Sequence, residues 1–267
     1  MTNIAYTVSD STTMFRRSLR RLVRYPSMTL LLVGMPVVFL LLFVYVFGGE
    51  LGRGLAHGLA GGFSGRAGYL NYVTPGILLI TVAAAVQGTA IVVAMDMTGG
   101  IIDRFRTMAI ARSAVLTGHV LASMIQTLAS LGIVVAVAVA LGFRPTDDPV
   151  AWLATIGMLT LFTLALIWLA TALGLAAKSV ETASNTPMFL TLLPFLGSGF
   201  VPTATMPAGL RQFAEYQPFT PVTETVRGLL TGTPIGDDAI AAAAWSVGIA
   251  LICYFWAVHL YRHRRRS

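Results

Sequence analysis

The segment that decides the topology of this chain is GGIIDRFRTMAIARSAVLTG, residues 99–118, a charged stretch between two long apolar runs. It carries one aspartate and three arginines in a chain where only 11% of the residues are charged. Apolar residues are interleaved with these charges, which is typical of a short amphipathic helix. Two interpretations follow: a solvated connector whose arginines hold it on the cytoplasmic side of a membrane, or a helix that transmits force from a soluble partner into the membrane.

The composition of the whole chain indicates that lipid is its solvent. Of its 267 residues 56% are hydrophobic, and the mean hydropathy is +0.77. A soluble domain carries about 25% charged residues, more than twice the share found here. The net charge of +7 comes largely from arginines at 16–24 and 262–266, which flank the first and last apolar runs. Such flanks orient a protein in a bilayer, whereas nucleic-acid binding requires a basic face with interleaved aromatic or hydrogen-bonding groups.

The familiar motifs of enzyme and metal sites do not occur in the sequence. Cys253 is the one cysteine, so neither an intrachain disulfide nor a cysteine metal site can form. There is no HExxH, no Walker A loop with its lysine and no GxGxxG. The sequence therefore predicts no catalytic residue, no metal site and no ATPase site in this chain.

The apolar runs predict an all-α integral membrane protein in one domain, 1–267, with six transmembrane helices, because about 20 apolar residues cross the hydrocarbon core. The predicted spans are residues 28–47, 74–95, 120–143, 150–177, 186–201 and 239–261. The fifth is short and broken by Pro187 and Pro194, and Pro149 suits the first turn of the fourth. An arginine-rich stretch from residue 11 has apolar residues at helical spacing, which predicts an N-terminal amphipathic helix at the membrane surface.

Two regions between spans are expected on the outer side. The glycine-rich residues 48–71 predict a flexible connector. Residues 202–238 are too short and too polar to cross, and their Thr-Pro pairs predict two short helices that dip into the outer interface. Glu224 and Arg227 are three residues apart and can pair on the surface of the second helix.

The distribution of basic residues predicts the orientation. With both ends in the cytoplasm, 13 arginines and lysines lie inside and five lie outside. This bias favours six spans with cytoplasmic termini, and it places residues 99–118 in the cytoplasm.

The predicted spans contain few polar residues, and small residues recur within them at four-residue spacing. Gln87, Gln126 and Asn185 are expected to form hydrogen bonds between helices rather than to contact a substrate. Small residues four apart, such as Ala170 and Gly174, allow two helices to approach closely in lipid.

Two stretches resemble a known family. GGIIDRFRTMAIARSAVLTGHVL, residues 99–121, and GFVPTATMPAGLRQFAEYQPFTPVTETVRGLLTG, residues 199–232, are similar to segments of ABC-2 type exporter permeases, within them the daunorubicin-resistance permease group. With the six-span hydropathy the resemblance covers nearly the whole chain. Ala109 stands where family members often have proline, and Gln217 where they often have asparagine.

The resemblance implies a permease subunit of an ATP-powered exporter of the bacterial plasma membrane, working as a dimer with a second permease copy or paralogue. A separate cytoplasmic ABC ATPase would bind ATP and Mg, so this chain would hold no cofactor. A coupling helix between spans 2 and 3 would dock on that ATPase through Asp103, Arg104, Phe105, Arg106, Thr107 and Met108. External re-entrant helices between spans 5 and 6 would cap the path, with the motif residues Phe200, Pro202, Met206, Pro207, Pro218, Pro221, Glu224 and Arg227. The transported compound would be hydrophobic or amphipathic, such as a drug, antibiotic or lipid-like metabolite.

Three other functions fit the residues less well. Ser198 and His259 could suggest a rhomboid-type intramembrane serine protease, but they fall near opposite ends of their spans, roughly 20 Å or more apart. An ion-coupled secondary transporter usually needs titratable groups in mid-membrane, and the predicted spans have no acid or base there. A channel needs a carbonyl filter or a ring of charges, and the sequence has neither motif.

Overall fold

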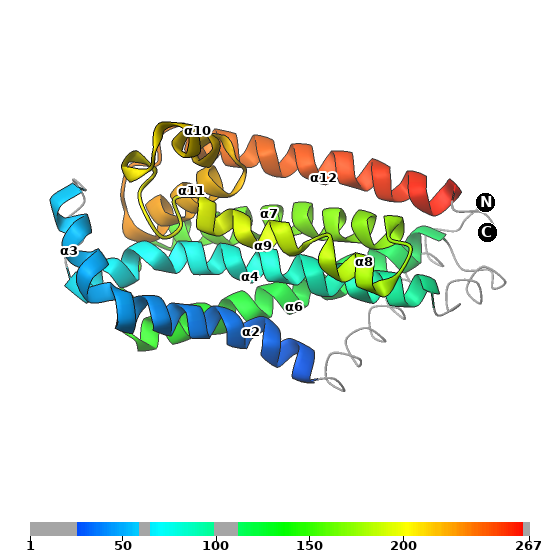
Figure 1. Ribbon diagram of the computed structural model, residues 1–267, viewed down its shortest axis with the longest axis horizontal. Helices are drawn as coiled ribbons and strands as arrows, with labels where there is room; N and C mark the ends of the chain where they lie inside the picture. The colour runs from blue at the N-terminus through cyan, green and yellow to red at the C-terminus, as the bar shows by residue number, and fades with distance from the viewer. Residues whose placement is uncertain (1–25, 59–64, 99–111, 264–267) are drawn as a thin grey trace.

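The computed structural model describes residues 26–58, 65–98 and 112–263, and they form helices joined by turns, with no strand in these ranges. In chain order the elements are α2 (Pro26–Leu41), the π-helical η1 (Leu42–Phe47), α3 (Gly48–Gly58), α4 (Gly65–Thr98), α6 (Arg112–Ala140), α7 (Pro149–Ala176), α8 (Val180–Asn185), α9 (Met188–Leu192), the 3-10 helices η2 (Leu193–Leu196) and η3 (Thr203–Thr205), α10 (Ala208–Tyr216), α11 (Phe219–Thr231) and α12 (Asp238–His263). Figure 1 shows the long helices side by side, with α3 and α10 at one end of the bundle.

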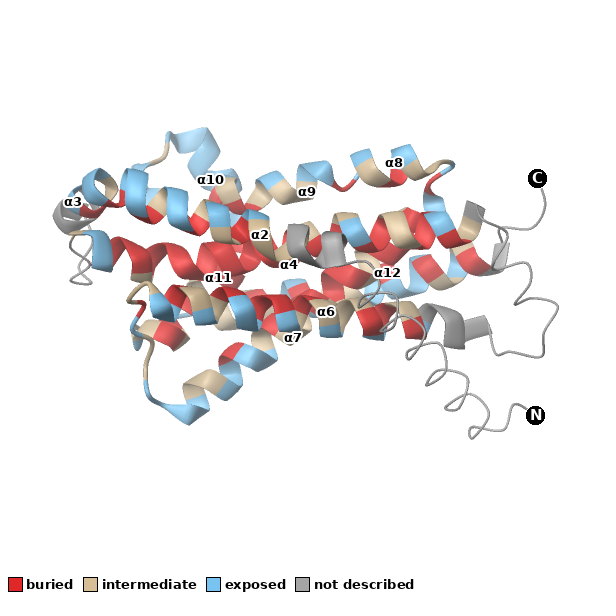
Figure 2. Ribbon diagram, turned by 90° about the horizontal axis from the view of Figure 1, so that it is seen from below, coloured by how far each residue is buried: buried red, intermediate tan, exposed pale blue. Residues whose placement is uncertain are grey.

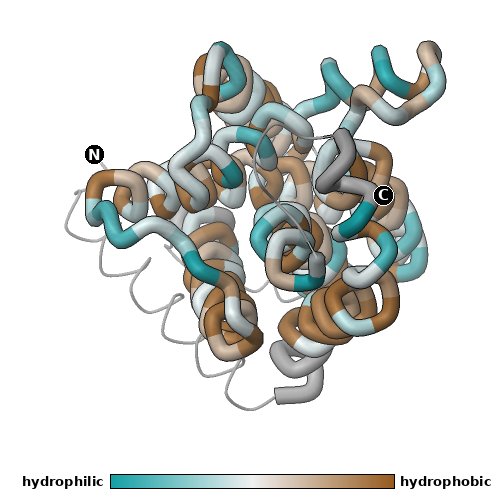
Figure 3. Tube along the Cα trace, turned by 90° about the vertical axis from the view of Figure 1, so that its left-hand side faces the viewer, coloured by the Kyte–Doolittle hydropathy of each residue, from teal (hydrophilic) through white to brown (hydrophobic). Residues whose placement is uncertain are grey.

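Within the described ranges, five helical runs are long and apolar enough to cross a membrane. They are Leu32–Arg53, Gly65–Met97, Thr117–Ala140, Pro149–Ala176 and Asp238–Tyr261. Each overlaps one of the predicted spans, so the first four and the last are confirmed as long apolar helices. Seen from the end that carries α3 and α10, hydrophilic residues gather in the turns and the long helices are mostly hydrophobic (Figure 3). The chain is a multi-pass membrane protein.

The fifth predicted span, 186–201, is not one helix. The two predicted proline breaks are confirmed, since Pro187 is the N-cap of α9 and Pro194 lies in η2. A proline lacks the N–H that continues a helix and crowds the preceding turn. The segment therefore contains the short helices α9 and η2, which follow α8, and all three pack along α4 (Figure 1).

The expectation of a flexible connector over residues 48–71 is wrong, because α3 occupies its first half and α4 already begins at Gly65. The glycines here permit close packing. A Cβ on Gly52 would lie 2.2 Å from the carbonyl oxygen of Gly65, so α3 can approach the start of α4 only without a side chain. Gly65 itself has φ +65°, a conformation that glycine adopts without strain. Glu50 and Arg53 pair at 2.8 Å on the exposed side of α3.

Helix α4 forms the centre of the bundle. Of its most apolar stretch 72% is buried, against 17 to 44% for the other four long helices. It packs against α2, α6, α7, α8 and α11, and Figure 2 shows buried residues concentrated in α4 and α11. Because the other long helices expose most of their apolar surface, their outer faces are the ones available to lipid.

Two contacts of α4 confirm predictions from the sequence. Gly174 of α7 lies against α4, where a Cβ would be 2.7 Å from the carbonyl oxygen of Ala90, so the small residue does allow a close helix–helix approach. The Gln87 amide donates to the Ser184 carbonyl at 3.1 Å, which is an interhelical hydrogen bond. For Gln126 and Asn185 this role stays a prediction.

Candidate functional site

The candidate site is the segment between η2 and α12, residues 197–237. It packs at the end of the bundle that also carries α3 (Figure 1). Its turns and short helices surround α11, whose residues are nearly all buried and pack against α4, α7 and α12. The site is therefore organised by α11 and by the surfaces that α11 contacts.

The ends of α11 follow from its sequence. The helix begins at Phe219, and Pro221 lies in its first turn, where a missing N–H costs no hydrogen bond. The sequence predicted Thr220 as the cap and Pro221 as the first helical residue, two residues later than the observed cap and start. The helix ends at Thr231 and is capped by Gly232, which has φ 71° and donates its N–H to the Gly228 carbonyl, as is common for a glycine after a helix C-terminus. A backbone bond of 2.7 Å from the Thr146 N–H to the Leu230 carbonyl then ties α11 to the turn before α7.

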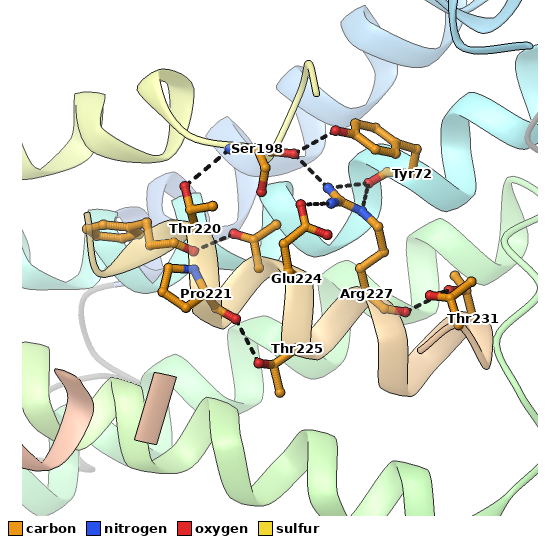
Figure 4. Close-up of polar contacts among 11 residues, drawn as sticks. Tyr72, Ser198, Thr220, Pro221, Glu224, Thr225, Arg227 and Thr231 are labelled. Carbon is orange, nitrogen blue, oxygen red and sulfur yellow. Dashed lines mark hydrogen bonds and ion pairs between the residues drawn. The ribbon is translucent and has the colours of Figure 1, made fainter. Parts of the chain in front are cut away.

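The centre of the site is the guanidinium group of Arg227 (Figure 4). Its Nε and Nη2 atoms each donate to the Tyr72 carbonyl oxygen of α4 at 3.2 Å, and Nη2 also donates to the Ser198 carbonyl oxygen at 2.7 Å. Nη1 pairs with the carboxylate of Glu224, one turn earlier on α11. The guanidinium carbon lies 3.9 Å from the centre of the Tyr72 ring. One side chain thus joins three segments that are distant in sequence.

The Glu224–Arg227 pair predicted from the spacing is confirmed, but its predicted place on the helix surface is wrong. Arg227 is only 5% exposed. A buried guanidinium is tolerated when its donors are satisfied, and backbone carbonyl oxygens supply partners that no spacing rule anticipates. One of those carbonyls belongs to Tyr72, three residues before Pro75 of α4; the N–H that Pro75 lacks would have bonded the carbonyl of Asn71.

A second junction joins the same segment to α4 through two glycines. A Cβ on Gly76 would lie 2.5 to 2.8 Å from backbone atoms of Gly199, so the two main chains are in direct contact. The Tyr72 hydroxyl donates to the Ser198 carbonyl at 2.9 Å beside this contact. The turn after η2 is therefore held on α4 by backbone contact as well as by Arg227.

Aromatic packing extends the junction to η1. Phe200 is 4% exposed, and its ring stacks on Phe195 at 4.8 Å with 10° between the planes. The centre of the Phe43 ring lies 4.4 Å from that of Phe200 and 6.5 Å from that of Phe195, so the three rings form one cluster. Phe200 therefore fixes the turn after η2 against the first long helical run, an interaction worth about 1 kcal/mol per aromatic pair beyond burial.

The eight external motif residues fall into two groups. Phe200, Glu224 and Arg227 take part in the contacts with α4 and η1 described above, and Pro221 lies in the first turn of α11. Pro202 and Met206 flank η3, Pro207 is the N-cap of α10, and Pro218 is the N-cap of α11. The second group shapes turns and helix starts, which agrees with the two predicted short helices.

At the opposite end of α4 the structure brings together two residues that flank residues 99–118. His119 Nε2 of α6 lies 3.1 Å from Asp96 Oδ2 of α4, with side chains 16% and 7% exposed. The predicted coupling residues Asp103, Arg104, Phe105, Arg106, Thr107 and Met108 lie outside the described residues, as does the predicted N-terminal amphipathic helix. The predicted second span ends at residue 95, just before Asp96, and the sequence suggested no role for His119.

The similarity to known proteins decides the family. The family model for ABC-2 type transporters matches residues 10–231, most of the chain. This chain belongs to the ABC-2 type transporter family. The match includes residues 99–121 and all of α11, so it covers the first stretch that suggested the family and all but the last residue of the second. Because the membrane domain of this family lacks the ATPase, an ABC-2 permease associates with an ATPase subunit.

Two relatives have names that refer to drug resistance. The daunorubicin resistance ABC transporter permease protein DrrB1 of Streptomyces coeruleorubidus is 27% identical over 248 residues, 92% of this chain and 81% of its own. The probable doxorubicin resistance ABC transporter permease protein DrrC of Mycobacterium tuberculosis is 25% identical over 179 residues, which are 66% of this chain and 64% of its own. The ABC-2 permease is thus similar to the first along nearly its whole length.

The geometry of the permease also disfavours a serine protease. Within the described residues the Ser198 hydroxyl has no hydrogen-bond partner, whereas a catalytic serine needs a base within about 3 Å. His259 lies 21 residues into α12, roughly 30 Å along the helix from the end that packs beside α11. No group of three His, Cys, Asp or Glu residues in the described ranges could hold a metal ion.

Proposed function

We propose that this ABC-2 permease forms half of the membrane pathway of an ATP-driven exporter and moves a hydrophobic or amphipathic compound outward. The observation that carries the proposal is its similarity, along 92% of the chain, to a permease named for daunorubicin resistance. The second half of the pathway would be another permease copy or a paralogue. ATP and Mg would bind to the ATPase partner.

The charge distribution supports a specific topology. The 13-to-five excess of basic residues favours cytoplasmic termini in a bacterial plasma membrane. This orientation requires an even number of crossings, and α8, α9 and η2 together would make the fifth of six. A broken crossing is tolerated in lipid where its free backbone groups are covered by neighbouring helices. The segment packs along α4, which supplies such cover.

This topology predicts the accessibility of two engineered cysteines. In a Cys253→Ala background, Arg106→Cys should be protected from a membrane-impermeant thiol reagent applied to intact cells, and Ala204→Cys, an exposed residue of η3, should be labelled. Opening the cells should make residue 106 reactive. Labelling of residue 106 from outside would mean that the orientation is inverted and that the segment cannot meet a cytoplasmic ATPase.

The coupling role is proposed for residues 103–108. Phe105 and Met108 would be apolar anchors in a cleft of the ATPase, and Asp103 with Arg104 and Arg106 would fix the register. The segment around α11 would cap the outer end of the path, because Arg227 holds it on α4, the central helix of the bundle.

The proposal is tested by reversing two charges. The double variant Arg104→Glu, Arg106→Glu should lose co-purification with the ATPase, or reduce ATP-dependent transport at least tenfold, because like charges then face the docking cleft. The fold should persist, as judged by a monodisperse detergent-purified protein. The matched control is Arg53→Glu, Arg144→Glu, the same charge change at exposed positions at the α3 end.

Unchanged transport in the Arg104→Glu, Arg106→Glu variant would rule out the coupling role. Substrate movement that needs an ion gradient and no ATPase would rule out the exporter itself in favour of a secondary transporter.

A further inference from the structure

The Asp96–His119 contact lies at the base of the segment between α4 and α6. Asp96 is two residues before the end of α4 at Thr98, and His119 is seven residues after the start of α6 at Arg112. The 3.1 Å distance between His119 Nε2 and Asp96 Oδ2 is a hydrogen-bond distance. A proton on Nε2 lets the imidazole donate to the carboxylate whether the ring is neutral or charged. The contact therefore joins the two helices that flank residues 99–111.

The Asp96–His119 pair is mostly buried, unlike an ordinary surface ion pair. The side chains are 7% and 16% exposed, and a carboxylate removed from water is tolerated only with good hydrogen-bond partners. Exposed ion pairs, such as Arg211–Glu215, need no such compensation. Losing His119 would remove one hydrogen-bond partner from a buried carboxylate and would weaken the link between α4 and α6 at this level.

The position of Asp96 connects it to the rest of the bundle. Val93 packs with Tyr261 of α12 and Leu175 of α7, and Ala94 packs with Ala177 and Ala183. From Asp96, α4 continues for 24 residues, roughly 36 Å, to Tyr72, whose carbonyl accepts two bonds from Arg227. A displacement of the C-terminal end of α4 can thus be transmitted through packed residues to the segment around α11.

We propose that Asp96 and His119 are positioning residues that clasp α4 to α6, so that a push on residues 97–118 moves both helices as one body toward the outer segment. This inference rests on the proposed coupling role of that segment. Without the clasp the segment would still bind the ATPase, but α4 and α6 would respond separately and less ATP energy would reach the outer end.

The test compares transport per ATP hydrolysed in proteoliposomes that contain the permease and its ATPase. Asp96→Leu and His119→Leu should each lower this ratio about tenfold, with co-purification of the ATPase and its turnover within about twofold of wild type. The double variant should be no worse than Asp96→Leu alone, because the contact with His119 is already lost in that variant. His119→Gln retains a donor near the position of Nε2 and should keep the ratio within about threefold.

The matched control is Gln87→Leu, which removes another interhelical hydrogen bond of α4, to Ser184, but away from the coupling segment. Its ratio should stay within about twofold of wild type. Additive losses in the double variant, or parallel losses of thermal midpoint, assembly and ATPase turnover, would overturn the clasp in favour of a purely structural pair. If the wild type transports with ATP and the Asp96 and His119 variants keep its transport per ATP, the clasp is overturned and the proposed function stands. If the wild type shows no ATP-driven transport, the proposed function and the clasp are both overturned.

Discussion

Replacing Arg227 with alanine is expected to lower the free energy of unfolding by about 3 kcal/mol, because a buried guanidinium with charge-assisted bonds is removed. The Tyr72 and Ser198 carbonyl oxygens lose their bonds to the side chain, and Glu224 loses its ion-pair partner. The loss of a large buried side chain adds a cavity cost. In detergent the change would be measured as a shift in the temperature at which half of the monodisperse protein is lost.

The matched control for Arg227 is Arg211→Ala. Arg211 also pairs with a glutamate on a short helix of the same segment, Glu215 at 2.7 Å, but the two side chains are 49% and 38% exposed. Its loss should cost less than about 0.5 kcal/mol. Arg227→Lys should lie between the two, because an ammonium group cannot reproduce the planar fork that meets two carbonyls and a carboxylate. Equal shifts for Arg227→Ala and Arg211→Ala would mean that the buried network does not hold the segment.

Replacing Gly76 with alanine is expected to cost roughly 2 to 3 kcal/mol, because the new methyl group meets main chain and not a flexible side chain. Its Cβ would lie 2.5 Å from the Gly199 carbonyl oxygen and 2.7 Å from the Gly199 Cα. The turn after η2 must therefore move away from α4, which also lengthens the bonds to the Ser198 carbonyl. Transport should fall with stability if this segment caps the path. The measurements are the thermal midpoint and ATP-driven transport.

Gly88 provides the control for Gly76 on the same helix. A Cβ on Gly88 would meet nothing within 4 Å. Gly88→Ala should therefore be neutral or stabilise the protein by up to about 1 kcal/mol, since alanine favours the helix. The two substitutions make the same chemical change with opposite expected signs. A neutral Gly76→Ala would show that the α4–Gly199 contact is looser than the structure has it.

Periodicity and helix-end signals in the sequence were sufficient for most local structure. Apolar runs of 20 or more residues indicated five of the long helices, and Pro149 indicated the start of α7, where the Asp148 side chain accepts from the Val150 N–H at 2.9 Å. The i,i+3 spacing of Glu224 and Arg227 predicted their pairing. These successes share one cause: each depends on neighbours within one or two helical turns.

The same local reasoning failed where distant segments meet. The glycines between 48 and 71 suggested flexibility, but Gly52 is a contact point between α3 and the start of α4. At 186–201 the sequence predicted the breaks at Pro187 and Pro194, but not that the short helices pack along α4. Composition cannot distinguish a glycine that loosens a chain from one that lets two backbones touch.

The sequence by itself determined that this is an all-helical, multi-pass ABC-2 permease, because hydropathy, charge placement and family motifs are properties of short stretches. Only the tertiary structure decided that Arg227 is buried against carbonyls 155 and 29 residues away, that Gly76 meets Gly199, and that Asp96 meets His119. The physical reason is that backbone carbonyls and glycine contacts have no side-chain signature. Their pairing is fixed by how the helices pack around α4 and not by any local pattern.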